Sequence, residues 1–173
     1  KNGAVTYMQT TDKLECLEKN AVVNGIRLTY FERGMVYRGV KPTLLFVHAT
    51  GFHARVWDKI INALGDFHSI SVDQRGHGRS EKKKTQHWSE VITDTSEMIE
   101  QLDLTNIIAI GHSMGAHALI GAAPKAEHRF LKIIAIDPVI PEEAAFMDDT
   151  PSPFNSAEQH PTAKRRNEFD SAE

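Results

Sequence analysis

Apolar and polar residues alternate along this chain with two different periods. Four short runs rich in apolar and β-branched residues are typical of strands: TLLFVHA, HSISVD, NIIAI and LKIIAID. The last two are nearly continuously apolar, as in parallel strands that are covered on both faces of a sheet. Between the runs, ARVWDKIINAL, HWSEVITDTSEMIEQLDL and MGAHALIGAA predict helices. The order predicts an α/β fold with a mostly parallel sheet and helices on both faces.

A hairpin is predicted ahead of these repeats. The runs CLEKNAVV and IRLTYFERG flank Asn24-Gly25, and Asn-Gly between two β-prone runs is the strongest short signal for a tight antiparallel turn. Cys16, the only cysteine, begins the first run, and we expect it to be a buried strand residue. The sheet therefore opens with two antiparallel strands.

The clearest helical period lies in residues 87–104. One side of this helix carries six recurring residues: Trp88, Val91, Ile92, Thr95, Ile99 and Leu102. We expect that side to pack on the sheet and the acidic residues to turn elsewhere: Glu90, Asp94, Glu97 and Glu100.

The character of the chain changes at Pro138. Residues 138–173 contain five of the seven prolines and no apolar strand run. We therefore divide the chain into a sheet-forming core over residues 1–137 and a separate excursion over residues 138–173.

Composition narrows the class of protein. A chain of 173 residues suits one domain, and its 40% hydrophobic and 25% charged residues are average for a soluble globular protein. A net charge of −3 argues against a nucleic-acid partner. No apolar stretch reaches the roughly 18 residues that span a bilayer, and one cysteine forms no internal disulfide. We expect a cytoplasmic protein.

The stretch GHSMGAH places Ser113 between a predicted strand and a predicted helix. A serine there is either a helix N-cap or a nucleophile on a sharp turn. Gly111 and Gly115 leave room where side chains would collide in such a turn, and the helix N-terminus favours developing negative charge. This context favours the nucleophile.

Acyl transfer also needs two N–H donors for the oxyanion. The first is expected from the backbone of Met114, directly after the nucleophile. The second is expected from the loop VHATGFH, at the N–H of Thr50, with Gly51 or Phe52 as alternatives. Phe52 is also a candidate for lining the substrate pocket.

The motifs HATGF, DQRGHGRS, GHSMGA and IAIDPVI follow one another in the order seen in the α/β-hydrolase superfamily. Over roughly residues 22–137 the chain resembles the esterase and epoxide-hydrolase-like branch of that superfamily. The resemblance implies a serine nucleophile at Ser113, a later acid, a still later histidine and a cap that begins near Pro138. It implies a small-molecule acyl substrate, such as an ester, and no metal or organic cofactor.

The base and the acid are the missing parts. Three histidines follow Ser113, namely His117, His128 and His160, and none has a position expected of the base. Asp137 is a candidate acid because it ends the strand after the nucleophile helix, although an Asp before Pro also suits an exit from the sheet.

We therefore expect an amino-terminal part of a longer serine hydrolase, with the acid and base beyond residue 173, and no turnover by the 173 residues alone. The alternative is a binding module or receptor that keeps the fold without hydrolysis. The acyl substrate and the oligomeric state are left open by the sequence.

Overall fold

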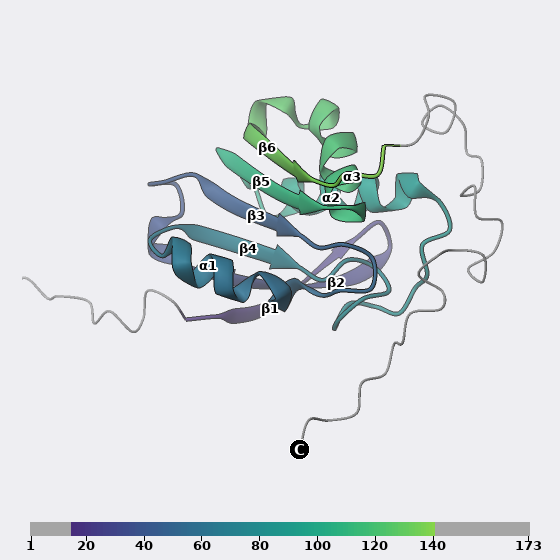
Figure 1. Cartoon of the computed structure of the whole chain (residues 1–173), viewed down its shortest axis with the longest axis horizontal. Coiled ribbons are helices and arrows are strands. Elements are labelled where there is room, and N and C mark those ends of the chain that lie inside the picture. Colours follow the sequence, from purple (N-terminus) through teal and green to yellow (C-terminus); the bar gives the residue numbers. More distant parts are fainter. Residues whose placement is uncertain (1–14, 141–173) are drawn as a thin grey trace, which may run out of the picture.

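The computed structural model describes residues 15–140 of the chain, which form one six-stranded sheet with helices on both faces (Figure 1). The strand order is β1-β2-β4-β3-β5-β6, with antiparallel pairing of β1–β2 and β2–β4 and parallel pairing of the others. The strands are β1 (Leu17–Val23), β2 (Ile26–Arg33), β3 (Thr43–Val47), β4 (His68–Val72), β5 (Ile107–His112) and β6 (Phe130–Ile136). The predicted fold class is confirmed.

The hairpin forms at the predicted turn. Asn24 and Gly25 both have positive φ, 47° and 70°, as a two-residue turn of this hand requires, and Val23 pairs with Ile26 across it. The prediction for Cys16 was wrong, because it lies just before β1 and is half-buried. Strand pairing starts one residue later, at Leu17, so the residue is only partly covered.

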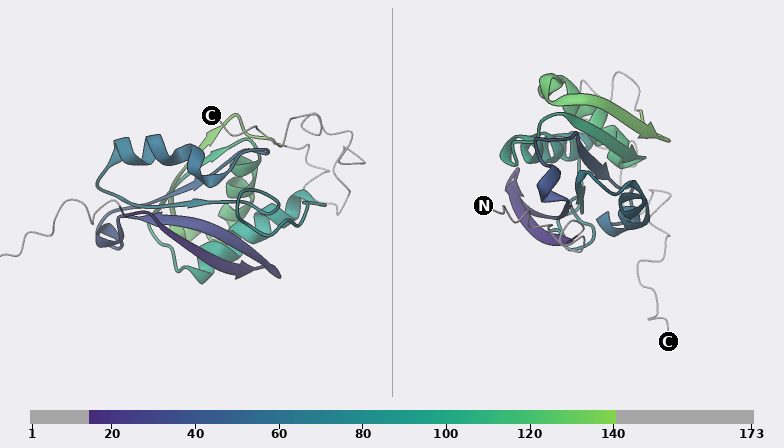
Figure 2. Two further views of the ribbon diagram at one scale, coloured as in Figure 1. Left: turned by 90° about the horizontal axis from the view of Figure 1, so that it is seen from below. Right: turned by 90° about the vertical axis from the view of Figure 1, so that its left-hand side faces the viewer.

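Side chains alternate across the sheet and build two cores. Leu45 and Val47 pack with the helices α2 (Trp88–Gln101) and α3 (Met114–Ala122), whereas Leu44 and Phe46 pack with the 3-10 helix η3 (Ala54–Trp57) and α1 (Asp58–Leu64). Figure 2 shows α1 on one face and α2 with α3 on the other. Both faces of β3 are therefore covered, as its run of apolar residues predicts.

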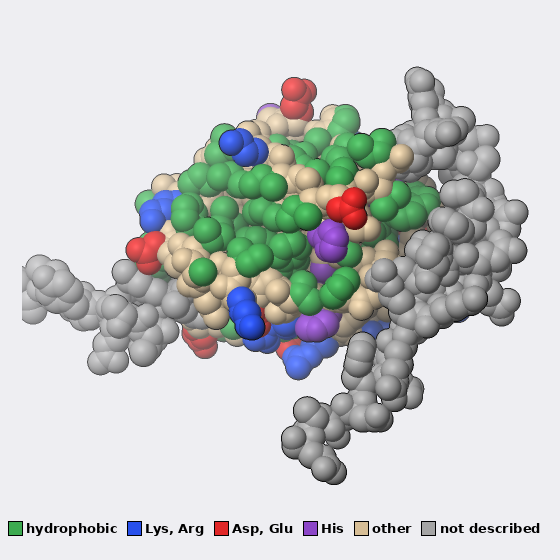
Figure 3. Space-filling view, in the orientation of Figure 1, with side chains coloured by type: hydrophobic (Ala, Val, Ile, Leu, Met, Phe, Trp, Pro, Cys, Tyr) green, Lys and Arg blue, Asp and Glu red, His purple; other side chains and the backbone are tan. Residues whose placement is uncertain are grey.

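Strand β6 forms one edge of the described sheet. Its residues Ile134 and Ile136 are 44% and 43% exposed, and on α1 the side chains of Ile60 and Leu64 are exposed as well. Figure 3 shows hydrophobic side chains gathered on this face of the molecule. Among the described residues no further strand or helix covers this surface.

Of the predicted excursion over residues 138–173, only 138–140 fall within the described part, so the expected cap lies outside it. None of the helices in residues 15–140 is long and apolar enough to cross a membrane.

Candidate active site

Ser113 is the only residue between β5 and α3, and its backbone is strained. Its φ is 51° and its ψ is −113°, a combination that residues with a Cβ seldom adopt. Its N–H donates to the carbonyl of Ile136 at 2.9 Å, and its carbonyl accepts from the N–H of His117 at 3.0 Å. Bonds on both sides therefore hold the turn in this conformation.

The geometry separates the two interpretations of Ser113. An N-cap serine has extended backbone, and its side chain accepts a hydrogen bond from the first turn of the helix. Ser113 has neither feature, because its φ is positive and its side chain makes no capping bond. The hydroxyl is thus left available at the carboxyl end of β5, and the N-cap interpretation fails.

The two flanking glycines are required by close packing. A Cβ on Gly111 would lie 2.6 Å from the Cα of Ala116, and a Cβ on Gly115 would lie 2.3 Å from the carbonyl oxygen of Val47. Both contacts are to backbone atoms that side-chain rotation cannot relieve. Helix α3 can therefore start directly behind Ser113 only if both positions lack a side chain.

The loop after β3 lies beside the sharp turn at Ser113, which we call the elbow. The hydroxyl of Thr50 is 3.4 Å from Sδ of Met114, so the two residues with the expected oxyanion donors are in contact. The N–H of Gly51 donates to Nε2 of His77 at 3.0 Å, and the N–H of Phe52 donates to the carbonyl of Ala49 at 3.1 Å. No acceptor within residues 15–140 binds the N–H of Thr50.

His48 connects this loop to the next one. Its Nδ1 bonds the carbonyl of Ala49 at 2.7 Å and must donate, while its Nε2 accepts from the N–H of Gln74 at 3.0 Å. Burial lowers the pKa of His48 to about 3. His48 is therefore neutral, has both ring nitrogens engaged, and cannot act as the base for Ser113.

The motif DQRGHGRS forms the loop after β4, to which His48 is bonded. The carboxylate of Asp73 accepts from the N–H of Ala54 at 2.6 Å and from the N–H of Arg79 at 2.7 Å. Arg75 is buried and binds both carboxylate oxygens of Asp94, at 2.6 and 2.7 Å. Both residues organise loops, and within the described part neither forms a bond to the hydroxyl of Ser113.

The prediction for Asp94 was wrong. It is buried on α2, not turned away from the core, and it also accepts from the side chain of Asn24 at 2.9 Å. The signal in the sequence is its position three residues after Val91 and four before Met98, on the apolar side of the helix. An acid at such a position requires a buried cation, and Arg75 is that cation.

The histidines after Ser113 do not supply a base within the described residues. His117 is buried, its ring centroid lies 4.9 Å from that of Trp88, and its Nδ1 bonds the carbonyl of Val139 at 3.1 Å. Helix α3 ends at Ala122, and His128 lies after it, in the second of two short 3-10 helices, η4 (Ala123–Lys125) and η5 (Glu127–Arg129), where it is exposed. His160 lies outside the described part.

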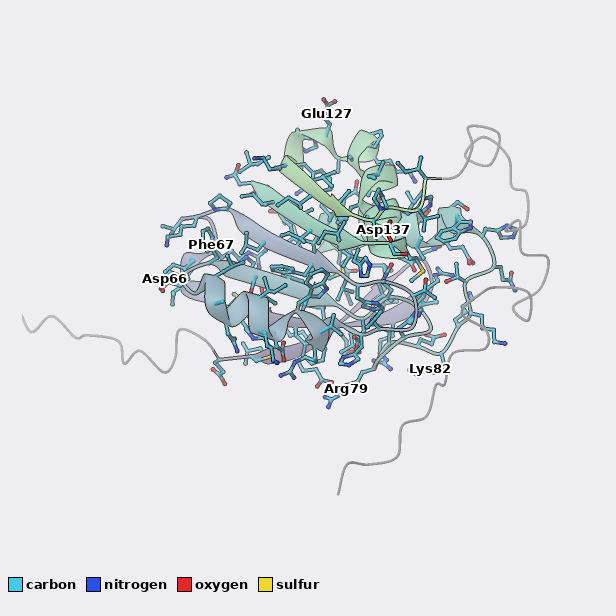
Figure 4. All side chains as sticks on the ribbon, viewed as in Figure 1. Asp66, Phe67, Arg79, Lys82, Glu127 and Asp137 are labelled. Atoms are coloured by element: carbon cyan, nitrogen blue, oxygen red, sulfur yellow. The ribbon has the colours of Figure 1, made fainter. Side chains whose placement is uncertain are left out.

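Asp137 and Phe52 flank the elbow. Asp137 is exposed and directly follows Ile136, whose carbonyl binds the N–H of Ser113, and Figure 4 shows it at the end of β6. The ring of Phe52 is 44% exposed and its centroid lies 6.3 Å from that of His112, the residue before Ser113. Both candidates are thus at the same edge of the sheet as Ser113.

Residues 42–167 match the family model for the alpha/beta hydrolase fold. The chain belongs to this family. Among curated proteins, the 2-(acetamidomethylene)succinate hydrolase of Mesorhizobium japonicum is 35% identical over 111 residues, which are 62% of this chain and 40% of that protein. A putative esterase/lipase of Haemophilus influenzae is 28% identical over 65% of this chain and 36% of its own length.

A solved N-formylmaleamic acid deformylase from Pseudomonas putida is 27% identical to this α/β-hydrolase chain, with a TM-score of 0.60. The match covers 70% of this chain and 47% of that structure. The chain thus spans about 40% of the length of the curated relatives it matches. These relatives are hydrolases, esterases and haloperoxidases.

Proposed function

We propose that this chain carries the nucleophile and the oxyanion hole of a serine hydrolase that acts on a small carboxylic ester or a related acyl compound. The observation that carries the proposal is the backbone of Ser113, with φ of 51° and no capping bond from its side chain. Such strain persists only where surrounding bonds hold it, and it occurs preferentially at functional sites.

In the proposed reaction, Oγ of Ser113 attacks the acyl carbon while a base takes the hydroxyl proton. The carbonyl oxygen of the substrate becomes an oxyanion, which accepts from the N–H groups of Met114 and Thr50. As this intermediate collapses, the base gives that proton to the leaving oxygen or nitrogen, which releases the alcohol or amine and leaves an acyl group on Ser113. Water, activated by the same base, then attacks the acyl carbon, releases the acid and restores the hydroxyl.

Three features of the structure support the oxyanion hole. Met114 is the first residue of α3, where backbone N–H groups have no partner within the helix. Thr50 lies against the side chain of Met114, and its N–H has no acceptor within residues 15–140, whereas those of Gly51 and Phe52 do. The choice of Thr50 over its two neighbours follows from these bonds.

In this proposal the base comes from outside residues 15–140, because His48 and His117 are both engaged and buried. Asp137 is the candidate acid within the described part. The relatives favour an acyl substrate, since one is named as a hydrolase of an acetamido compound, 2-(acetamidomethylene)succinate, and another as a deformylase of N-formylmaleamic acid.

The test is to treat the native full-length protein with a fluorophosphonate and to map the adduct by mass spectrometry. We expect the label on Ser113 and a loss of hydrolysis of about 10⁶-fold in Ser113→Ala. Ser89→Ala, at an exposed position of α2, is the matched control and should keep wild-type labelling. Labelling that survives Ser113→Ala contradicts the proposal.

The same experiment tests the second candidate, a binding module, which the absence of a free base near Ser113 within the described residues favours. A native protein that binds acyl compounds but forms no adduct and releases no product would establish that function. The 173 residues alone are expected to give no turnover in either case.

A further inference from the structure

His77 lies in the loop after β4, and the proposed reaction assigns it no step. Its Nε2 accepts from the N–H of Gly51 at 3.0 Å, and its Nδ1 lies 2.8 Å from the carbonyl oxygen of Arg75. A carbonyl oxygen only accepts, so the proton of the ring is on Nδ1 and Nε2 carries the lone pair. The two partners therefore select one neutral tautomer of His77.

The bond from Gly51 to His77 holds a residue that packing does not hold. Gly51 is exposed, its φ is 81°, and a Cβ at this position would meet no atom within 4 Å. Its position is therefore set by hydrogen bonds. The residue before it is Thr50, the proposed oxyanion donor, so a shift of Gly51 changes the direction of the Thr50 N–H.

Hydrogen bonds attach the loop after β3 to the loop after β4 at three points. At its start, Nε2 of His48 accepts from the N–H of Gln74; at its end, the N–H of Ala54 donates to Asp73. The bond from Gly51 to His77 is the middle attachment and the one nearest to Thr50. The outer two hold residues that are themselves buried, whereas the middle one holds an exposed residue.

We propose that His77 is a positioning residue for the oxyanion hole, whose neutral imidazole holds Gly51 and thereby aims the N–H of Thr50 at the substrate. The proposal rests on the proposed function of Ser113. When His77 gains a proton, both ring nitrogens become donors, Nε2–H faces the N–H of Gly51, and the attachment is lost.

The surroundings of His77 set the pH range in which the bond to Gly51 is lost. Burial, the largest influence, lowers its pKa, and Lys82 in the same loop lowers it further, whereas the carbonyl of Arg75 and the carboxylate of Asp73 act in the opposite direction. The ring of His48, 5.2 Å away between centroids, is the titratable group that faces it from the β3 side. The net result is a pKa below the ordinary 6.5, so the attachment is intact at neutral pH and is lost in acid.

The first test measures the rate of Ser113 labelling, and kcat and KM for a p-nitrophenyl ester, in the native protein between pH 5 and 8. We expect His77→Ala to lower kcat and the labelling rate about 10-fold to 100-fold with little change in KM, because the lost interaction acts mainly in the transition state. His128→Ala, at an exposed position beyond α3, is the control and should match the wild type.

His77→Gln separates positioning from simple structural support. A glutamine carbonyl can accept from Gly51 but does not titrate in this range, so the variant should recover most of the rate and lose the acid limb that His77 contributes. A wild-type rate in His77→Ala, or an unchanged pH profile in His77→Gln, overturns the proposal.

A second measurement is independent of activity. In the catalytically silent Ser113→Ala protein, the amide resonance of Gly51 should titrate with the same midpoint as the ring of His77, and that midpoint should lie below 6.5. An amide that does not follow His77 refutes the attachment even if labelling is normal. A wild-type protein that never labels refutes the proposed function of Ser113, and the role of His77 with it, whereas the resonance still reports the bond itself.

Discussion

The two ends of the neighbouring strands β3 and β4 both hold histidines, but the partners of these histidines differ. His68 at the amino end and His48 at the carboxyl end are buried, and His77 at the carboxyl end is half-buried. At the amino end, Nε2 of His68 lies 2.8 Å from the carboxylate of Glu32, and its Nδ1 lies 2.9 Å from the hydroxyl of Thr43. Lys19 also pairs with Glu32. At the carboxyl end, His48 and His77 bond only backbone N–H and C=O groups of two loops.

The difference lies in which groups meet at each end. At the amino end, side chains from adjacent strands meet each other, so a buried charge is balanced by other side chains. At the carboxyl end, loops and a helix N-terminus bring backbone N–H groups together, which suits the binding of a developing negative charge. One end therefore supports the fold, and the other presents the candidate site. Four changes test this division, in order of decreasing effect.

Glu32→Ala should have the largest effect on stability. It removes one partner of a buried pair and leaves His68 without its acceptor, which costs about 3–5 kcal/mol of the free energy of unfolding. Denaturant unfolding measures the loss, and labelling of Ser113 per folded molecule should be unchanged. Glu32→Gln keeps an acceptor for His68 and should cost less. A labelling rate that falls with Glu32→Ala would show that the two ends are coupled.

Asp73→Ala tests the opposite end. The variant leaves the buried N–H of Ala54 without its acceptor, and we expect a loss of about 1.5–3 kcal/mol because each bond to the carboxylate is charge-assisted. Unlike Glu32→Ala, it should also slow the labelling of Ser113, since the loop that carries Thr50 is released at one end. Glu127→Ala, at an exposed position after α3, is the control. Normal labelling in Asp73→Ala would contradict the division.

The pH dependence of stability separates the two ends without a mutation. The folded pKa of His48 is lowered from 6.5 to about 3 by burial, so below pH 6.5 the unfolded chain binds a proton that the folded chain does not. The contribution of His48 to stability is complete above pH 6.5 and declines by about 1.4 kcal/mol per pH unit as pH falls toward 3.

Glu32 contributes in a lower window. Burial, the largest influence, raises its pKa, but hydrogen bonds from His68 and Lys19 outweigh burial and lower it to about 2. Its contribution is complete above pH 4.5 and is lost as pH falls toward 2. Urea unfolding of the native protein at pH 7, 6 and 5 should show the slope of His48, to which His77 and His117 add because burial lowers their pKa values too. Glu32→Gln should not change this slope. A free energy of unfolding that is flat between pH 6.5 and 5 would contradict the assignment of His48.

Thr43→Val should have the smallest effect. It removes the hydroxyl that bonds Nδ1 of His68 while keeping the size of the side chain, which costs about 1 kcal/mol. Denaturant unfolding measures the change, and Thr43→Ser should restore most of it. Labelling of Ser113 is expected to stay at the wild-type rate in both variants, and a decrease confined to Thr43→Val would argue against independent ends.

Local patterns predicted most of the fold. Asn24-Gly25 specified the hairpin because only residues that tolerate positive φ fit its turn, and the apolar runs specified the strands because both of their faces are buried. The prediction failed where a partner from elsewhere decides the environment. Cys16 stops short of strand pairing, and Asp94 is buried because Arg75 comes from a loop 19 residues away in the chain.

The candidate site was predictable only in part. The glycines around Ser113 indicated a tight turn, because the lack of a side chain at two positions is itself a sequence signal, and the loop of Thr50 was expected in the stretch VHATGFH. No pattern indicated His77 as a loop connector, because its partners are backbone atoms, which every residue carries and no sequence distinguishes.

The sequence by itself determined the order of the elements, the position of the elbow and the residues that form the two cores, because these depend on local periodicity and on residues with special backbone freedom. Tertiary structure alone decided the backbone strain of Ser113, the availability of the Thr50 N–H and the neutral tautomers of the two histidines. Each of these depends on which atoms from β3, β4 and β6 meet at one edge of the sheet, and that meeting exists only once the strands are paired.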